Sequence, residues 1–284
     1  MIHDALHPDV DEALAAWAAR VRANREQVEV VREAAPKDFY GAIASMFRVD
    51  PFRRGESTLE ALRALVQPTW TLLDIGAGGG RYALPLSLMC REVIALDPSE
   101  RMLGVLRESI AEHYIPNVSV VHGRWPMDSQ GLTADAALIA HLGYDVEDIG
   151  PFLDAMESAA RAVCVAVLLE QPPPTEADRL WPMVHGIERA QLPSLPEFLT
   201  LLLARGRLFD VQLVDRTPQT YDQPDQALAW LRGQLWTAPD SPKDQRLQRL
   251  LHERVEQRDG RYALSWEPVR VGVVTWRPTY GAST

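Results

Sequence analysis

Residues Thr71 to Tyr82 read TLLDIGAGGGRY, and this stretch decides the fold that we expect for the chain. It begins with an apolar run that ends at Ile75, and glycine then occupies four of the five positions Gly76 to Gly80. A helical pattern of apolar residues starts at Tyr82. The order predicts a buried strand, a turn without side chains and the N-terminus of a helix. Such a turn lets the backbone approach a ligand closely and directs unpaired N–H groups at it.

Two kinds of nucleotide-binding protein use this arrangement, and the spacing separates them. The dinucleotide pattern G-x-G-x-x-G/A, counted from Gly76, would place Arg81 where a small residue belongs. The stretch resembles instead motif I of the class I S-adenosylmethionine-dependent methyltransferases, D/E-x-G-x-G-x-G, which is matched by Asp74, Gly76, Gly78 and Gly80. The resemblance covers about residues 71–170 and implies S-adenosylmethionine as the cofactor.

The rest of the chain fits the fold of that family. Further strands are expected at residues 92–96, 117–121, 134–139, 161–170, 208–214 and 269–275. The resemblance implies a doubly wound α/β fold with a seven-stranded, mostly parallel sheet, an antiparallel terminal hairpin and N-terminal helices. Helices are expected at residues 9–35, 37–48, 57–66, 151–160, 196–205, 226–236 and 243–257.

We expect residues 1–56 to form a helical extension that either packs on the core or caps the active site. Residues 57–284 would form the methyltransferase core, with a helical insertion at about 218–262 between the last two strands. Ser57 and Glu60 have the spacing of a capping box at the start of the core.

The resemblance also implies which residues bind the cofactor. The glycine loop would hold the methionine portion, Asp74 the amino group through water, and Asp97, about 20 residues after the first glycine, the ribose hydroxyls. Met102 is either a core residue or a contact beneath the adenine. The full candidate set is Asp74, Gly76, Ala77, Gly78, Gly80, Tyr82, Asp97, Pro98, Met102, Arg124, Trp125 and His141.

The turn after the third strand departs from the family pattern. The family often has Gly-Asp-Ala there, with the acidic side chain on the adenine amino group, whereas this chain has Gly123, Arg124 and Trp125. Adenine recognition would then depend on backbone groups, on Trp125 or on Asp128.

The turn after the fourth strand supplies the candidates for catalysis. His141 could act as a base, because imidazole titrates near neutral pH, or could hydrogen-bond the cofactor or the loop backbone. Tyr144 is a second catalytic candidate, and His185 is a weaker one for lining the acceptor pocket. We expect no metal, because the sequence has no tight cluster of His, Asp and Glu with ligand spacing.

Composition limits the partners and the cellular location. The net charge of −10 disfavours a nucleic-acid partner, and no apolar run reaches the ~20 residues that cross a bilayer. The acidic N-terminus does not resemble a signal peptide, and the two cysteines, Cys90 and Cys164, suggest no disulfide framework. The sequence therefore predicts a cytoplasmic protein; it predicts nothing about its oligomeric state.

Three functions remain open. The first is methyl transfer from S-adenosylmethionine to the oxygen or nitrogen of a small molecule, which the negative charge and the long insertion favour. The second is a methyltransferase that acts on RNA or protein. The third is a binding protein without transfer activity, which the altered turn at Arg124 allows, or a nicotinamide enzyme, which Arg81 disfavours.

Overall fold

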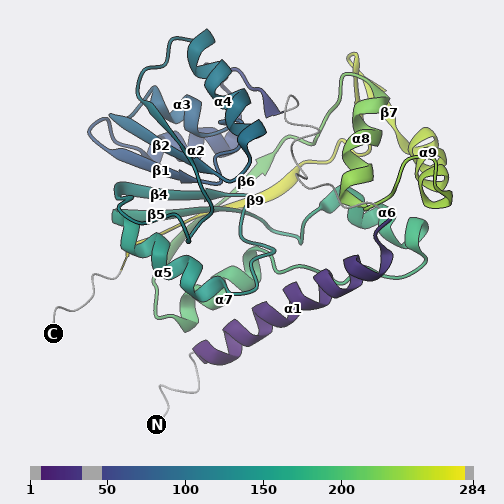
Figure 1. Cartoon of the computed structure of the whole chain (residues 1–284), viewed down its shortest axis with the longest axis horizontal. Coiled ribbons are helices and arrows are strands. Elements are labelled where there is room, and N and C mark those ends of the chain that lie inside the picture. The colour runs from purple at the N-terminus through teal and green to yellow at the C-terminus, as the bar shows by residue number, and fades with distance from the viewer. Residues whose placement is uncertain (1–7, 34–46, 279–284) are drawn as a thin grey trace.

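The computed structural model describes residues 8–33 and 47–278 and contains a seven-stranded sheet in the order β3-β2-β1-β4-β5-β9-β6 (Figure 1). Strands β1 to β5 are parallel, and β9 runs antiparallel to both β5 and β6. This arrangement confirms the predicted fold class and its antiparallel end. The strands are β1 Thr71–Ile75, β2 Glu92–Asp97, β3 Val118–His122, β4 Ala134–Ala140, β5 Ala160–Leu169, β6 Phe209–Arg216 and β9 Val269–Trp276.

Helices cover both faces of the sheet, which is why its central strands are mostly apolar and are buried along most of their length. All five residues of β1 are buried. Helices α2, α3 and α4 lie on one face, and α5 and α7 lie on the other (Figure 1). These helices are α2 Ser57–Leu65, α3 Ala83–Ser87, α4 Glu100–Glu112, α5 Ile149–Ala159 and α7 Leu195–Ala204.

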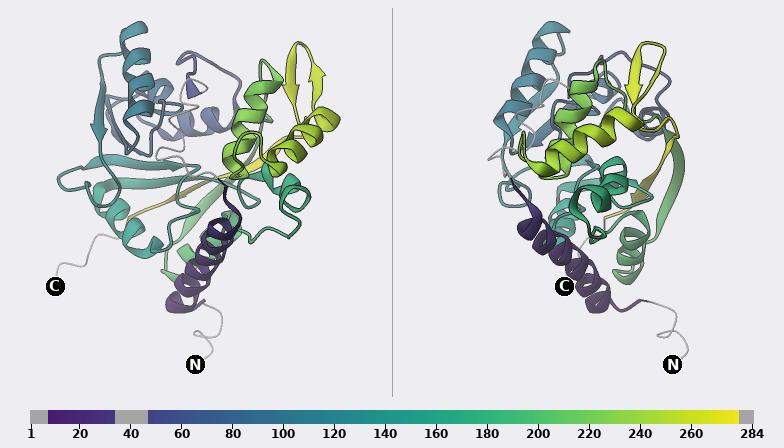
Figure 2. Two further views of the ribbon diagram at one scale, coloured as in Figure 1. Left: turned by 45° about the vertical axis from the view of Figure 1, so that its right-hand side comes forward. Right: turned by 90° about the vertical axis from the view of Figure 1, so that its right-hand side faces the viewer.

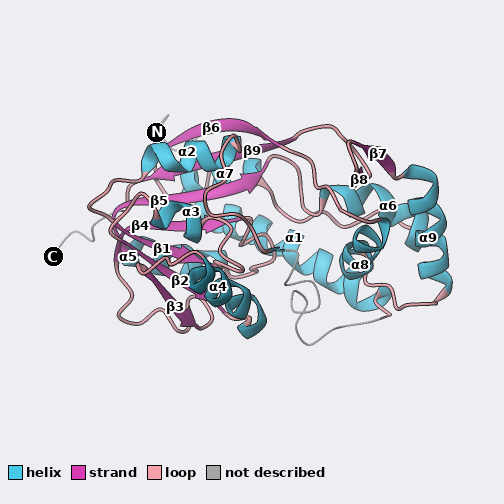
Figure 3. Ribbon diagram, turned by 90° about the horizontal axis from the view of Figure 1, so that it is seen from above, coloured by secondary structure: helices cyan, strands magenta, loops and turns pink. Residues whose placement is uncertain are grey.

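A second group of elements, which we call the helical lobe, lies beyond one end of the strands (Figures 2 and 3). It consists of α6 Thr175–His185, α8 Pro224–Gln234, α9 Pro242–Arg254 and the hairpin of β7 Glu256–Arg258 with β8 Arg261–Ala263. Strands β5 and β6 both lead into it, so the lobe faces the C-terminal ends of the parallel strands. The site expected at those ends therefore has the lobe as a neighbour.

The lobe has its own hydrophobic core, separate from the core around the sheet. Trp181 and Tyr221 are among its fully buried members, and they pack with apolar residues of α6, α8 and α9. Helix α1, Val10–Val31, joins the two cores. Trp17 and Val21 near its start belong to the sheet core, and Val28 and Val31 near its end belong to the lobe core.

The sequence prediction was wrong at three local points. The chain forms helix α6, which was not predicted, and Ser57 is the first residue of α2 and not its cap. The helix predicted at residues 243–257 ends at Arg254, and the unpredicted hairpin of β7 and β8 follows it. Glu56 occupies the cap position, and the Glu60 carboxylate accepts hydrogen bonds from the Gly55 amide (3.3 Å) and the Arg63 side chain (2.7 Å). The helix predicted at residues 37–48 lies mostly outside the described residues.

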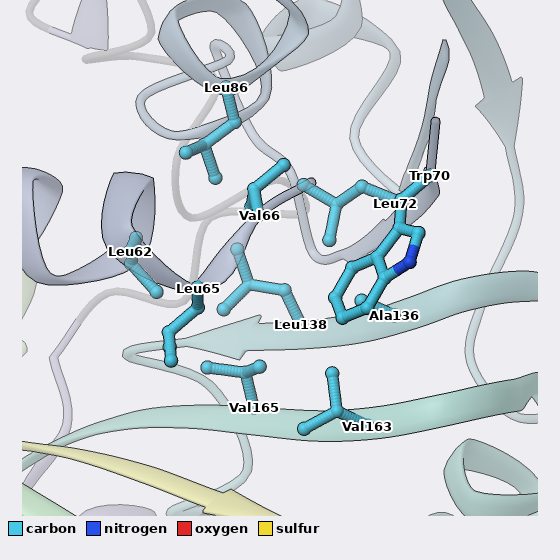
Figure 4. Close-up of a pocket in the computed structure, with 10 residues that line it drawn as sticks. All are labelled: Leu62, Leu65, Val66, Trp70, Leu72, Leu86, Ala136, Leu138, Val163 and Val165. Carbon is cyan, nitrogen blue, oxygen red and sulfur yellow. The ribbon is translucent and has the colours of Figure 1, made fainter. Parts of the chain in front are cut away.

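A small cavity lies between α2 and the sheet, well inside the core (Figure 4). Its volume is about 10 Å³, and apolar side chains such as Leu62, Trp70 and Leu138 line it. A space of that size without polar partners does not hold a ligand. Within residues 8–33 and 47–278, none of the helices combines the length and the apolar character needed to cross a bilayer.

Candidate active site

The glycine loop follows β1 at the C-terminal edge of the sheet and is held there by backbone hydrogen bonds. The amides of Gly76 and Ala77 donate to the Leu96 carbonyl over 2.8 and 3.0 Å. Gly76, Gly78 and Gly80 have φ values of 75°, 54° and 87°, which disfavour any side chain. The motif glycines are therefore needed for the backbone conformation itself.

Asp97 ends the neighbouring strand β2 and is tied to this loop. Its Oδ2 accepts a hydrogen bond from the Gly78 amide (2.9 Å), and its Oδ1 accepts one from the Ser99 amide (2.8 Å). The side chain is buried, so these two amides hold the carboxylate in one orientation. Pro98 follows it in an exposed position, and the Met102 side chain lies against the loop, 2.9 Å from where a Cβ on Gly78 would stand.

Asp74 lies in β1 and is 2% exposed. Burial is the main cause that raises the pKa of Asp74 to about 7, and the negative charge of Asp97 adds to it. A hydrogen bond from the Ala83 amide has a smaller, opposite effect on this pKa. Two carboxylates therefore face the same region, and one of them is close to its titration midpoint at neutral pH. A cationic ligand group at this place would favour ionisation of both.

The turn after β3 is built differently from the candidate adenine site that the sequence suggested. Trp125 is buried in the core, where its indole N–H donates to the Phe152 carbonyl over 3.1 Å. The Arg124 side chain is exposed, and its amide donates to the Asp128 Oδ2 over 2.7 Å. The Trp125 indole is thus fixed in the core. The Asp128 carboxylate is the acidic side chain that lies at this turn.

His141 follows β4 at the same edge of the sheet. Its backbone has a φ of 55°, and its amide donates to the Val167 carbonyl over 2.8 Å. Neither ring nitrogen has a partner among the described residues, although both are buried. Burial, with the charges of Arg216 and Arg81, lowers the pKa of His141 well below 6.5. The imidazole is therefore neutral at physiological pH and keeps a free lone pair.

The other aromatic and histidine candidates have structural partners. The Tyr144 hydroxyl accepts a hydrogen bond from the Leu169 amide over 2.7 Å, and burial raises the pKa of this tyrosine. Tyr82 is buried at the start of α3, and its ring centre lies 6.5 Å from that of His141. His185 lies in the helical lobe, with its Nε2 2.9 Å from the Leu235 carbonyl oxygen.

Arginines form a part of the site that the sequence prediction missed. The Glu56 carboxylate binds Arg53 (3.0 Å) and Arg81 (2.8 Å) beside the glycine loop. Arg216, at the end of β6, is half-buried and adds its charge to the same region. The sequence signal for Arg216 was its position at the end of a strand. Its neighbours at the site come from distant segments of the chain.

A larger hollow, of about 560 Å³, is lined by Phe52, Arg54, Leu88, Met89 and neighbouring residues. The glycine loop, the two aspartates and His141 line neither this hollow nor the small core cavity. We therefore place the candidate site by its chemistry at the strand ends, where open α/β sheets bind their ligands. The described residues contain no group of three or more metal-ligating side chains.

Comparison with known proteins agrees with this geometry. Residues 72–162 match a family model described as a methyltransferase domain. No curated protein matches the sequence. Among solved structures, the YcgJ protein from Bacillus subtilis is 15% identical, covers 79% of this chain and 99% of its own, and has a TM-score of 0.53.

Two further solved structures have names that state an activity. Magnesium protoporphyrin IX methyltransferase from Synechocystis PCC 6803, with bound S-adenosylhomocysteine, is 12% identical, covers 85% of this chain and 97% of its own, and has a TM-score of 0.51. Coclaurine N-methyltransferase, bound to N-methylheliamine and S-adenosylhomocysteine, is 12% identical, covers 94% of this chain and 93% of its own, and has a TM-score of 0.50. These similarities show the fold. The family match shows a methyltransferase domain at residues 72–162, and the matched motif of the glycine loop lies inside it.

Proposed function

We propose that the protein transfers a methyl group from S-adenosylmethionine to a small-molecule acceptor held between the C-terminal edge of the sheet and the helical lobe. The observation that carries this proposal is His141, whose two ring nitrogens are buried without a partner among the described residues. Buried polar atoms are nearly always hydrogen-bonded in a folded protein. An unsatisfied imidazole at the sheet edge therefore indicates that a ligand supplies its partner.

The residues of the loop fit S-adenosylmethionine. A Cβ on Gly78 would come within 2.9 Å of the Met102 Cε, so the space beside this glycine has no room for a side chain. The Asp97 carboxylate is oriented by two amides, and a carboxylate is a hydrogen-bond acceptor of the kind that ribose hydroxyls bind. Asp74 would hold the ammonium group of the methionine portion, and that contact would lower its pKa again.

When bound, S-adenosylmethionine would supply an electrophilic methyl group for attack by a lone pair of the acceptor. The protein contributes position, because the glycine loop and Asp97 hold one reactant and the lobe side of the site holds the other. The neutral His141 can accept a hydrogen bond from an N–H or O–H of the acceptor and so direct its lone pair. With its pKa well below 6.5, it is a weak base and acts by orientation more than by removing a proton.

Two observations favour a small molecule over a macromolecule. The net charge of −10 opposes binding of nucleic acid. The two similar methyltransferases described above act, by their names, on magnesium protoporphyrin IX and on coclaurine, and each covers more than four fifths of this chain. Asp97, Asp74 and the glycine loop would serve the cofactor, and His141 and the lobe would serve the acceptor.

The test is calorimetric titration of the protein with S-adenosylhomocysteine and, separately, with NAD. Asp97→Asn keeps the shape of the side chain but removes its charge, and we expect it to weaken S-adenosylhomocysteine binding by about tenfold or more. Asp210→Asn, an exposed change on β6, serves as the control and should bind as the wild type does. Binding of NAD in place of S-adenosylhomocysteine, or equal affinity of both variants, would contradict the cofactor assignment.

A further inference from the structure

Arg216 carries a half-buried charge without a direct hydrogen-bond or ion-pair partner in the described part of the protein. It is the last residue of β6 and pairs in register with Val269 of β9. The residue is half-buried, and its guanidinium makes no hydrogen bond or ion pair with any residue of 8–33 or 47–278. Arg207, just before the same strand, shows the usual solution, because it donates two hydrogen bonds to Glu157 over 2.9 and 2.7 Å.

The place of Arg216 in the fold is the active-site edge. Strand β6 runs parallel to β5, because both pair antiparallel with β9. Its last residue therefore lies at the same edge as Asp97 at the end of β2 and His141 after β4. Arg216 thus stands at the lobe end of the site, where the chain leaves the sheet for Tyr221 and α8.

The charge of Arg216 affects titratable groups both at the sheet edge and in the helical lobe. On the sheet side, its charge contributes to lowering the pKa of His141 and opposes the rise in pKa that burial causes at Tyr144. On the lobe side, it opposes the rise in pKa of Glu176 and Tyr221. The charge of Arg216 thus acts on two groups at the sheet edge and on two groups in the lobe. Arg216 therefore acts electrostatically on both the sheet edge and the lobe.

The acidic groups that act on Arg216 are not in direct contact with it. The Glu56 carboxylate is bound by Arg53 and Arg81, and its charge opposes the lowering that burial and Arg81 cause in the pKa of Arg216. Glu176 contacts the Tyr221 hydroxyl at 3.4 Å, and burial raises its pKa to about 7. The guanidinium therefore keeps its hydrogen-bond donors available for a ligand anion.

We propose that Arg216 binds a carboxylate group of the methyl acceptor, an assignment that rests on the proposed methyltransferase function. The planar guanidinium presents paired N–H donors that match the two oxygens of a carboxylate. Glu176 favours a single negative charge over the double charge of a phosphate. When protonated it can donate a hydrogen bond to a carboxylate, and when ionised it repels a dianion more strongly.

The experiment uses benzoate as the probe, with benzamide as its neutral analogue and phenyl phosphate as its dianionic one. Each is titrated calorimetrically at millimolar concentration into the whole protein, with and without saturating S-adenosylhomocysteine. We expect benzoate to bind more tightly than either analogue. Arg216→Gln should weaken benzoate binding roughly tenfold to a hundredfold, and Arg216→Lys should weaken it less. Arg270→Gln is the control, because Arg270 is an exposed arginine on the adjacent strand β9.

Several outcomes would overturn the assignment. Equal binding of benzoate and benzamide, no binding of benzoate, or equal loss in the Arg270 control would each do so. Tighter binding of phenyl phosphate than of benzoate would show that Arg216 binds a phosphate group and not a carboxylate. A loss of S-adenosylhomocysteine affinity in Arg216→Gln would assign this arginine to the cofactor. Failure of the wild type to bind S-adenosylhomocysteine would contradict the proposed function separately, because the titration of benzoate alone still measures the role of Arg216.

Discussion

Replacing Gly80 by alanine tests whether the glycine loop is determined by its backbone and its packing. Gly80 has a φ of 87°, and a left-handed backbone costs an L-residue about 1–2 kcal/mol. The new Cβ would stand 2.6 Å from the Leu106 Cδ1 and 2.9 Å from the Leu84 Cγ. Both leucines are completely buried, and overpacking of this kind costs about 1–3 kcal/mol. Gly80→Ala should therefore lower the free energy of unfolding by about 2–5 kcal/mol.

Gly104 provides a matched control in the same domain. It lies in the interior of α4, it does not have a positive φ, and a Cβ there would meet no atom within 4 Å. Gly104→Ala should raise the free energy of unfolding by about 0.5–1 kcal/mol, because alanine loses less backbone entropy in a helix. The same chemical change should thus have opposite effects at the two glycines.

Urea unfolding followed by far-UV circular dichroism gives the midpoint and the slope for each variant. An unchanged slope with a lower midpoint for Gly80→Ala would assign the effect to the stability of the native state. The reasoning would be refuted if Gly80→Ala unfolded within about 0.5 kcal/mol of the wild type, which is the range of neutral surface changes. It would also be refuted if Gly104→Ala were destabilised to the same extent.

Two other changes test the assignments of single side chains. Tyr144→Phe removes the hydroxyl that accepts the 2.7 Å hydrogen bond from the buried Leu169 amide, so the free energy of unfolding should fall by about 1–3 kcal/mol, while S-adenosylhomocysteine affinity, measured by calorimetry, stays within about twofold. Burial and the charge of Asp97 raise the pKa of Asp74 to about 7, so the folded protein holds a proton that the unfolded chain, with a value of 3.8, releases. The free energy of unfolding should therefore fall as the pH rises between these two values, and Asp74→Asn should remove that fall; an unchanged difference between pH 5 and pH 8 would contradict it.

The sheet could be predicted from the sequence because its signals are local. A buried run, the glycines and Asp97 stand close together in the chain, and the ends of neighbouring parallel strands necessarily meet at one edge. The pairing of β6 with β9 followed from the family resemblance and is confirmed by the register from Phe209 and Trp276 to Arg216 and Val269.

Helix α6 had a signal that the prolines obscured. Its buried residues Ala177, Leu180, Trp181 and Val184 have helical spacing. Three consecutive prolines precede the helix and Pro182 lies inside it, and proline usually ends a helix. The packing of this face against the lobe core outweighs that local preference.

The acceptor side of the site could not be predicted, because it depends on contacts between distant segments. The lobe core combines the end of α1 with α6, α8 and α9, and no short motif marks where these segments meet. Arg216 shows the physical consequence. A buried charge without a partner lowers the stability of the free protein, and a ligand anion would offset that cost on binding. An anion bound by Arg216 should therefore stabilise the protein as well as hold the acceptor in place.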